Sequence, residues 1–386
     1  MSLPAVVVAH NRYRLEGGEE RCVALQLAAL QEAGIPWELL ERRSSALSRA
    51  QAARLLLAGG GESSLADLLA KLRQRAADRR VVLHAHNLLP AFGPRLLEAA
   101  HANGVPTVLQ LHNLRLSCAI GVAWRDRRPC SSCRGRFTLP AVVHRCRRSR
   151  LESAVYAAAL ARHFERTLGA VDRFVVPSAY ARQRVQQIGV PPARTLVVSH
   201  YLPDGACARA SGAGHGRYAL VAARLSPEKG IERAIRACAA VGVPLVVAGE
   251  GPDRPRLQRL AESLAANCKF VGWVGERELR ALRAEAACAL FPSEFPEFAP
   301  YSALEALAAG VPAVATDVGA LPEILGRDAC VPLHDEDAFA SRLEALWVDP
   351  DRRAAEGEAA LARARTEYGK ERYLASLMSL YGELLA

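Results

Sequence analysis

Short apolar runs alternate with helical patterns along the first two hundred residues. Val-rich strands that alternate with helices indicate a parallel sheet covered by helices on both faces. Helices are predicted over residues 17–34, over residues 94–104 and directly after Ser178, a residue type that caps helix N-termini. The runs that predict strands are AVVVAH (5–10), RVVLHAHN (80–87), PTVLQLHN (106–113), RFVVPS (173–178) and TLVVSHYLPDG (195–205).

A small, Gly-rich stretch, ACARASGAGHG (206–216), interrupts this pattern and predicts a linker. The alternation then restarts, with Ser226 as the expected cap of the next helix. An amphipathic helix is predicted for the chain end, KERYLASLMSLYGELL. Strands are predicted at RYALVAARL (217–225), PLVVAGEGP (244–252), KFVGWV (269–274), CALFPS (288–293) and PAVATD (312–317).

The fold class expected from this repetition is α/β, with two Rossmann-like domains facing a central cleft. We place the first domain at 1–205, the second at 206–365 and a terminal helix at 366–386, which would pack back on the first domain. Ligands of such sheets bind at the carboxyl ends of the strands, so motifs directly after a strand are the candidates for function.

Length and composition are compatible with two globular domains. The chain has 386 residues, of which 51% are apolar, and it lacks an uninterrupted apolar run of about 18 residues that would suggest a spanning helix. The start, MSLPAVVVAHNRY, has neither the basic leader nor the cleavage site of a signal peptide. These features predict a cytoplasmic location.

The charge is polarised along the chain. Residues 1–200 hold 29 Lys and Arg against 14 Asp and Glu, and residues 101–150 hold ten Arg and a single acid, Asp126. Such an excess suggests an anionic partner, namely phosphate groups, lipid headgroups or nucleic acid, although an Arg-rich composition also follows from a GC-rich genome. A single-stranded nucleic-acid site would interleave aromatic residues with the basic ones, and only Trp124 and Phe137 are aromatic here. We therefore expect no nucleic-acid partner.

Four of the ten cysteines lie close together, in an insertion at 114–150. Their spacing, Cys118-x11-Cys130-x2-Cys133-x12-Cys146, suits a structural zinc site in a reducing compartment. Four free thiols or a redox-active CxxC are the alternatives. The other six cysteines are scattered and fit small buried hydrophobic positions.

A glycine motif and a basic motif each follow a predicted strand. Gly17 and Gly18 would let the backbone of a helix N-terminus approach an anion, although a plain turn has the same residues. Arg224 and Lys229, in ARLSPEKG (223–230), follow the first strand of the second half. A guanidinium fork and an ammonium together suit a diphosphate, whereas exposed basic residues near a cap would need no ligand.

Two carboxylates stand out in EFPEFAPYSALEALAAGVPAVATDVGALPE (294–323). Glu297 is expected in a strand-end loop, and Glu305 in the helix that Gly310 ends. A carboxylate accepts hydrogen bonds from sugar hydroxyls, so the pair could hold two hydroxylated rings of one ligand. Without a ligand they would be an ordinary loop acid and an ordinary helix residue.

The whole series of motifs resembles the retaining, GT-B-fold glycosyltransferases of family four. The resemblance rests on GGEE, ARLSPEKG, VVAGEGP, VGWV, PS, Glu-x7-Glu and GVPAVATDVGALPE, in this order over nearly the whole chain. It implies an enzyme of the EC 2.4 class that moves a sugar from a nucleotide diphosphate donor, UDP more often than GDP. It also implies a glycan or lipid-linked acceptor, bound by the first domain, in surface polysaccharide synthesis.

The resemblance also implies roles for individual residues. Arg224 and Lys229 would bind the donor diphosphate beside the turn of Gly17 and Gly18, and Glu305 would bind the ribose. Glu297 would contact the transferred sugar, as would the backbone of Phe298 and Ala299, where the family usually has Gly-Phe-Gly. The base would lie at the backbone of Trp273 and Val274.

His112, at the end of LQLHN, resembles the His or Asp that faces the reacting centre in the family. His86 in HAHN also ends a strand, a position more often structural. Catalysis would consist of positioning and of charge stabilisation by Arg224, Lys229 and helix N-termini. Since no acidic pair is placed to chelate a metal, we expect transfer without a metal cofactor.

Two other enzyme classes have a similar shape. A nucleotide-sugar epimerase would need further acid–base groups, and a sugar phosphorylase a free-phosphate site or a pyridoxal lysine; neither is evident. The cysteine insertion resembles a subset of bacterial polysaccharide enzymes, and its Arg-rich flanks suit an acceptor pyrophosphate or the inner membrane surface. The helix expected over 147–169 could lie on a bilayer, but core packing is the commoner role of such a stripe.

Overall fold

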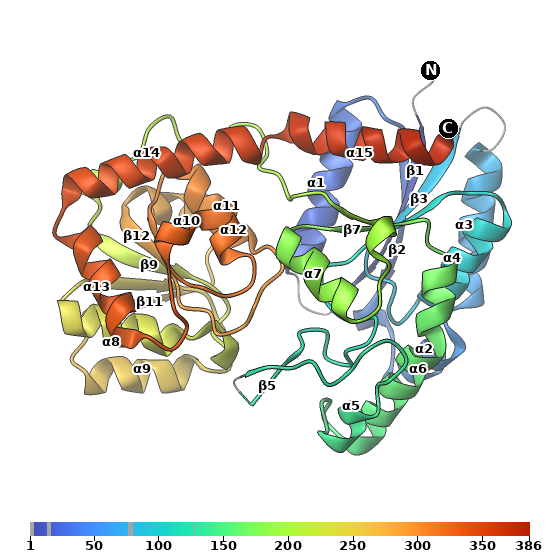
Figure 1. Cartoon of the computed structure of the whole chain (residues 1–386), viewed down its shortest axis with the longest axis horizontal. Helices are drawn as coiled ribbons and strands as arrows, with labels where there is room; N and C mark the ends of the chain where they lie inside the picture. The colour runs from blue at the N-terminus through green and yellow to red at the C-terminus, as the bar shows by residue number, and fades with distance from the viewer. Residues whose placement is uncertain (1–3, 14–16, 76–79, 127) are drawn as a thin grey trace. The chain divides into compact units, whose positions relative to one another are not determined.

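The computed structural model describes residues 4–13, 17–75, 80–126 and 128–386. It divides into two compact units: residues 1–125, 129–199 and 373–386 form the first, and residues 126–128 and 200–372 form the second. Figure 1 shows the elements of both units. None of the helices in the described part of the chain is long and apolar enough to cross a membrane.

The first unit contains a six-stranded parallel sheet in the order β2-β1-β3-β4-β7-β8. Its strands are β1 (Ala5–Arg12), β2 (Trp37–Arg43), β3 (Val81–Ala85), β4 (Thr107–Gln110), β7 (Arg173–Val176) and β8 (Thr195–Val197). Its helices are α1 (Gly18–Glu32), α2 (Arg49–Ala58), α3 (Glu62–Arg75), α4 (Gly93–Ala102), α5 (Pro140–Val143), α6 (Arg150–Gly169), α7 (Ala179–Gln187) and most of α15 (Lys370–Leu385), with short 3₁₀ turns at Ser44–Ala46 and Pro192–Arg194. The two-residue strands β5 (Trp124–Arg125) and β6 (Arg128–Pro129) lie in the cysteine segment.

The second unit repeats the architecture with the order β11-β10-β9-β12-β13-β14. Every pairing in its sheet is parallel. Its strands are β9 (Tyr218–Ala222), β10 (Leu245–Ala248), β11 (Cys268–Gly272), β12 (Ala286–Phe291), β13 (Ala313–Thr316) and β14 (Cys330–Val331). Its helices are α8 (Ile231–Val241), α9 (Arg254–Ser263), α10 (Glu276–Ala284), α11 (Tyr301–Ala308), α12 (Leu321–Leu325), α13 (Glu336–Trp347) and α14 (Pro350–Glu367), with 3₁₀ turns at Ala213–His215, Pro227–Lys229 and Arg327–Ala329.

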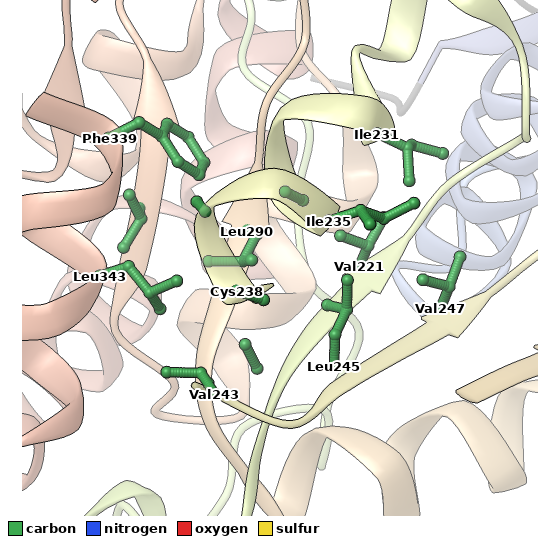
Figure 2. Packing of buried hydrophobic residues seen from close by; sticks show 14 of the residues in the cluster. Val221, Ile231, Ile235, Cys238, Val243, Leu245, Val247, Leu290, Phe339 and Leu343 are labelled. Atoms are coloured by element: carbon green, nitrogen blue, oxygen red, sulfur yellow. The ribbon is translucent and has the colours of Figure 1, made fainter. Parts of the chain in front are cut away.

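Alternate residues of the second sheet face opposite layers of helices. Val221 and Val247 pack with Ile235 of α8 and Phe339 of α13 in one core, shown in Figure 2. Their strand neighbours, such as Leu220 and Val246, belong to a second core on the other face, which includes Ala306 of α11. A strand buried on both faces needs a continuous apolar run, which explains why these strands could be recognised in the sequence.

The structure confirms most predicted elements and corrects some. The start of α7 matches the prediction, because Ser178 caps the helix by accepting a hydrogen bond from the Ala181 N–H (3.0 Å). Ser226, however, does not cap α8: Gly230 precedes its first residue, and the Ser226 side chain forms no cap hydrogen bond. The sequence pattern did not predict β2, α2, α3 and β14. WELLERR, the sequence of β2, mixes polar with apolar residues, and CV, that of β14, is only two residues long.

Helix α6 is a core helix rather than a membrane-surface helix along most of its length. Its apolar face is buried through Ala157, Leu160, Phe164 and Leu168, and it packs against α2, α4 and α5. Its N-terminus is capped by Ser149, whose hydroxyl accepts a hydrogen bond from the Glu152 N–H (3.1 Å). The alternative that the sequence left open, core packing, is therefore confirmed.

Candidate functional site

The strand order of the second unit brings two of the predicted loops together. The order of its six strands is the 3-2-1-4-5-6 arrangement in which the chain direction across the sheet reverses between β9 and β12. At such a switch point ligands bind in the crevice outside the carboxyl ends of the strands. The loop after β9 carries Arg224 and Lys229, and the loop after β12 carries Glu297.

Lys229 and Glu297 form an ion pair at this point. Lys229 Nζ lies 2.6 Å from Glu297 Oε2, and about a fifth of each side chain is exposed. The Ser293 hydroxyl donates to the other carboxylate oxygen of Glu297 at 3.4 Å. The structure thus places a cation and a carboxylate, both accessible, at the edge where the sequence predicted donor binding.

Backbone contacts hold the two loops against each other. The N–H groups of Glu294 and Phe295 both donate to the Glu228 carbonyl, at 3.0 and 3.2 Å. Gly230 has a φ of +60°, and a Cβ at this position would lie 2.0 Å from the carbonyl oxygen of Pro292. Only glycine fits there. The close contact between the two loops therefore requires a glycine directly after Lys229.

Arg224 lies more open to solvent than Lys229. Its side chain is 62% exposed and donates to Glu228 Oε1 at 2.6 Å. Burial opposes ionisation of Glu228, but hydrogen bonds from Ser226, from backbone and from Arg224 lower the pKa of this carboxyl below its usual range. Glu228 therefore stays anionic and orients the guanidinium.

Glu305 is held by a partner that the sequence analysis did not identify. Its carboxylate accepts from the guanidinium of Arg283 on α10, and both side chains are nearly buried, at 11% and 8% exposure. The arginine offers a further way to orient Glu305, which the sequence analysis assigned to the ribose. The signal in the sequence was weak, since Arg283 lies in an otherwise ordinary polar helix.

The remaining predicted donor residues differ in exposure. Phe298 is buried and Ala299 is partly exposed. Val274 is partly buried and packs, as Leu279 and Leu282 do, against the core that contains Leu220 and Val246. Trp273 is 78% exposed, so its ring is available at the surface beside the end of β11.

At the first unit's β1–α1 turn, Gly17 and Gly18 are exposed, whereas Leu15 and Glu16 lie outside the described residues. The Glu20 carboxylate accepts hydrogen bonds from the N–H groups of Tyr13 and Gly17, each at 2.9 Å. The Gly17 N–H is thus bonded to Glu20 in this structure.

Glu19 is an unusual carboxyl beside the same turn. Burial raises the pKa of Glu19 to about 6, while Arg115 opposes the shift. Asn113 Nδ2 donates to its Oε1 at 2.6 Å, and its Oε2 is buried with no hydrogen-bond partner among the described residues. Glu19 lines a pocket with His86, His112 and Arg115, a role that the sequence pattern did not reveal.

His112 ends a buried hydrogen-bonded chain that reaches α15. His112 Nε2 lies 2.9 Å from His86 Nδ1, and His86 Nε2 lies 2.5 Å from Gln26 Oε1. The Gln26 amide nitrogen in turn donates to His84 Nδ1 at 3.0 Å, and the Tyr381 hydroxyl lies 2.6 Å from the same His84 atom. Burial lowers the pKa of His84 to about 4, so this imidazole is neutral.

The first sheet explains why these residues meet. Strands β1, β3 and β4 are neighbours, and His86 and His112 follow the ends of β3 and β4. Figure 1 shows α15 alongside this unit, where Tyr381 completes the chain. Both histidines could be predicted as candidates from the sequence, but their pairing could not. Gln26 and Tyr381, which come from helices, were not predicted.

The four clustered cysteines line a pocket of the first unit. All four are reduced and partly exposed, and all four line the same pocket, beside Trp124 and Arg184. Burial, followed by the neighbouring Cys118 and Cys146, raises the pKa of Cys133 to about 11. Within the described residues no three of these sulfur atoms come within 4.8 Å of one another, so the pocket gathers the thiols without closing them into a tetrahedron.

Comparisons with known proteins cover nearly the whole chain. Residues 210–363 match the model of the glycosyl transferases group 1, and residues 16–201 match that of glycosyltransferase family 4. A GDP-mannose-dependent α-(1-6)-phosphatidylinositol dimannoside mannosyltransferase of Mycobacterium tuberculosis is 35% identical over 237 residues, which are 57% of this chain. The chain spans 60% of the length of that relative.

Solved structures share the fold. Sucrose-phosphate synthase from Thermosynechococcus elongatus aligns over 99% of both chains with a TM-score of 0.68 at 16% identity. HepE of Anabaena, solved in complex with UDP, aligns over 99% of this chain and 100% of its own with a TM-score of 0.66 at 15% identity. Both support two Rossmann-like units of the GT-B type. The chain belongs to the group 1, family 4 glycosyltransferases.

Proposed function

We propose that this chain is a retaining glycosyltransferase that moves a sugar from a nucleotide diphosphate donor to a glycan or lipid-linked acceptor. The observation that carries the proposal is the pairing of Lys229 with Glu297 at the switch point of the second sheet. Family membership supports the reaction class. In this proposal the second unit binds the donor and the first unit binds the acceptor.

The reaction breaks the bond between the anomeric carbon and the diphosphate oxygen, and it forms a bond to an acceptor hydroxyl on the same face. The hydroxyl proton ends on the leaving diphosphate. Lys229 and Arg224 stabilise the negative charge that develops on that group. Glu297, which holds Lys229 in the structure, would exchange this ion pair for hydroxyls of the transferred sugar when the diphosphate engages the lysine.

Glu305 and the backbone near Phe298, Ala299 and Val274 complete the proposed donor site. Arg283 pairs with Oε2 of Glu305 and so orients a carboxylate whose oxygens can accept from ribose hydroxyls. Because Lys229 and Arg224 supply the positive charge, we propose that transfer needs no metal ion. A rate that does not rise when divalent metal ions are added is the expected result.

The nucleotide base of the donor is either uracil or guanine. The family resemblance favoured UDP, whereas the mycobacterial relative is named for GDP-mannose. We retain UDP as the proposal and GDP-mannose as its direct competitor. The acceptor of that relative is a phosphatidylinositol mannoside by name, which supports a lipid-linked acceptor and action at the inner membrane surface.

His112 is the proposed catalytic residue of the first unit, in the pocket it shares with His86, Asn113, Arg115 and Glu19. The chain through His86 orients its ring. An imidazole held in one tautomer presents a defined donor or acceptor to a sugar hydroxyl. The Gly17–Gly18 turn remains a proposed phosphate contact, for which the Gly17 N–H would have to leave Glu20.

Thermal-shift titration with UDP, GDP and their sugars tests the proposal. Stabilisation by one nucleotide family, lost in Lys229→Ala and reduced in Glu305→Ala, is expected. Lys71→Ala is the matched control, since Lys71 Nζ pairs with Glu38 at the same 2.6 Å and with similar exposure. A protein that no nucleotide stabilises, or a Lys229→Ala variant that still responds fully, would contradict the proposed donor site.

We also propose that Cys118, Cys130, Cys133 and Cys146 bind a structural zinc ion. Zinc–sulfur bonds of about 2.3 Å put the four sulfur atoms about 3.8 Å apart, so side-chain rotation within the pocket must bring them together. Metal analysis should find one zinc per chain, lost in Cys133→Ser and kept in Cys207→Ser. A zinc-free wild-type protein that is equally stable with and without chelator would reject this site.

A further inference from the structure

A cluster of exposed apolar side chains lies in the segment that follows the CxxC motif. The exposed fractions are 61% for Phe137, 60% for Leu139, 64% for Val143 and 77% for Leu151. Only two other large apolar side chains in the described residues, Trp273 and Val348, reach such values. Water-exposed apolar surface of this density marks an interaction site.

Local structure forces these side chains outward. Arg134 and Phe137 exchange backbone hydrogen bonds of 3.1 and 2.8 Å in a tight turn. The Thr138 hydroxyl anchors the turn by donating to the Ala157 carbonyl of α6 at 2.7 Å. On the following helix, α5, Ala141 is buried against α6, whereas Leu139 and Val143, four residues apart, share one exposed side.

The start of α6 belongs to the same end of the unit. The Cys146 N–H donates to the Ala141 carbonyl at 3.0 Å, and the Arg147 N–H donates to the Ser153 hydroxyl at 3.1 Å. These bonds tie α5 to the first turn of α6, where Leu151 lies. The four apolar side chains are therefore presented by one compact, anchored structure rather than by a loose loop.

Arginines outnumber acidic residues in the segment that carries these side chains. Residues 134–151 contain six arginines and no Asp or Glu. Arg147 pairs with Glu152 at 2.9 Å and lies over the Tyr156 ring. The other five are exposed and have no ion-pair partner among the described residues: Arg134, Arg136, Arg145, Arg148 and Arg150.

We infer that this Arg-rich apolar patch, consisting of Phe137, Leu139, Val143, Leu151 and the five exposed arginines, docks the enzyme on an anionic lipid bilayer. Apolar side chains inserted at the headgroup boundary combine with basic residues that attract anionic lipids. A protein partner would have to be apolar and acidic at once, whereas a bilayer with anionic headgroups offers both features over any area. The excess of arginine in the segment of these exposed apolar side chains favours the bilayer.

The inference rests in part on the proposed function, because docking there would bring the enzyme to a lipid-linked acceptor. Its test is independent of catalysis. The full chain is sedimented with vesicles of phosphatidylcholine containing phosphatidylglycerol, and with vesicles of phosphatidylcholine alone. Binding to the anionic vesicles that weakens with added salt is expected.

Two variants separate the apolar and the basic contributions. Leu139→Ser with Val143→Ser should weaken binding to anionic vesicles about tenfold or more, and Arg136→Gln with Arg148→Gln should do likewise while removing much of the salt dependence. Val348→Ser, at a side chain that is 68% exposed on the second unit, is the matched control and should bind as wild type. Far-UV circular dichroism checks that each variant is folded.

Several results would overturn the inference. These are a wild-type chain that binds neither vesicle, patch variants that bind as well as wild type, or a patch that is saturated by a soluble protein and ignores vesicles. Vesicle binding by a chain that no nucleotide stabilises would keep the patch and reject the proposed function. Donor binding without vesicle binding would reject the docking patch and keep the proposed function.

Discussion

The imidazole of His112 is hydrogen-bonded to that of His86, with 2.9 Å between His112 Nε2 and His86 Nδ1. Gln26 Oε1 can only accept, so His86 carries its proton on Nε2. Its Nδ1 is then an acceptor, and His112 must donate from Nε2. The Tyr381 and Gln26 donors to His84 Nδ1 are consistent with the same assignment. The buried chain therefore leaves the lone pair of neutral His112 on Nδ1.

Replacing His86 should disturb His112 without unfolding the site. His86→Phe removes the acceptor, and we expect kcat to fall about tenfold with little change in the donor KM, because orientation rather than binding is lost. His86→Gln, whose amide oxygen can still accept, should recover part of the loss. Nitrogen-15 NMR of the wild type should show His112 protonated at Nε2.

His101→Phe, at an exposed position of α4, is the control for loss of a histidine. An unchanged kcat in His86→Phe would show that His86 has no positioning role. A His112 protonated at Nδ1 would mean that the Gln26 amide is turned the other way and that the proton order of the chain is reversed.

The pair of Arg283 and Glu305 should be costly to break. Both side chains are nearly buried, so Arg283→Leu leaves a buried carboxylate without its cation, and we expect a loss of about 3–5 kcal/mol in the free energy of unfolding. Arg217→Leu, which breaks the exposed pair with Glu285, should cost about 1 kcal/mol or less. Urea denaturation measures both, and equal losses would contradict the assignment.

Gly230 should tolerate no side chain. Gly230→Ala places a Cβ against the Pro292 carbonyl at a left-handed φ, so we expect a loss of about 3 kcal/mol or more in stability together with weaker nucleotide binding through Lys229. Gly242→Ala has a similar positive φ but meets no described atom within 4 Å, and it should cost about 1 kcal/mol. Thermal unfolding and nucleotide titration of the two variants compare the sites.

Glu19 should make stability depend on pH. Its pKa is about 6 in the folded chain, against 4.5 ordinarily, so the folded state binds the proton more tightly and loses stability as the pH rises through this interval. Glu19→Gln should therefore raise the free energy of unfolding near pH 8 by up to about 2 kcal/mol. The advantage should disappear near pH 4.

The control for this pH dependence is Glu262→Gln, at an exposed position of α9. Denaturation at both pH values measures the difference. A Glu19→Gln variant that is no more stable than wild type near pH 8 would show that Arg115 and Asn113 compensate fully for the burial of the carboxylate.

The sequence predicted those elements whose signal is local. Strands β9, β10, β12 and β13 are buried on both faces, and their continuous apolar runs identify them. Strand β2 was not predicted because it is an edge strand in which polar and apolar residues are mixed. The start of α8 was misplaced because the sequence does not show that Pro292 approaches Gly230.

The candidate site divides in the same way. Arg224, Lys229, Glu297 and His112 were identified because each follows a strand, where ligands of parallel sheets bind. Their partners could not be predicted. Arg283 lies on a helix that the sequence does not connect with Glu305, and Gln26 gives no sign that it will join two histidines. The burial of Glu19 could not be predicted, because two adjacent glutamates at a helix start are usually exposed to solvent.

By itself, the sequence determined the two α/β halves and the residues that stand at their strand ends, because apolar periodicity and turn residues act over a few positions. The tertiary structure alone decided which side chains meet. Strand order joins the ends of β9 and β12, and of β3 and β4, and such pairings depend on how distant segments pack. Burial, which raises the pKa of Glu19 and holds His84 neutral, likewise arises only when those segments close around the side chain.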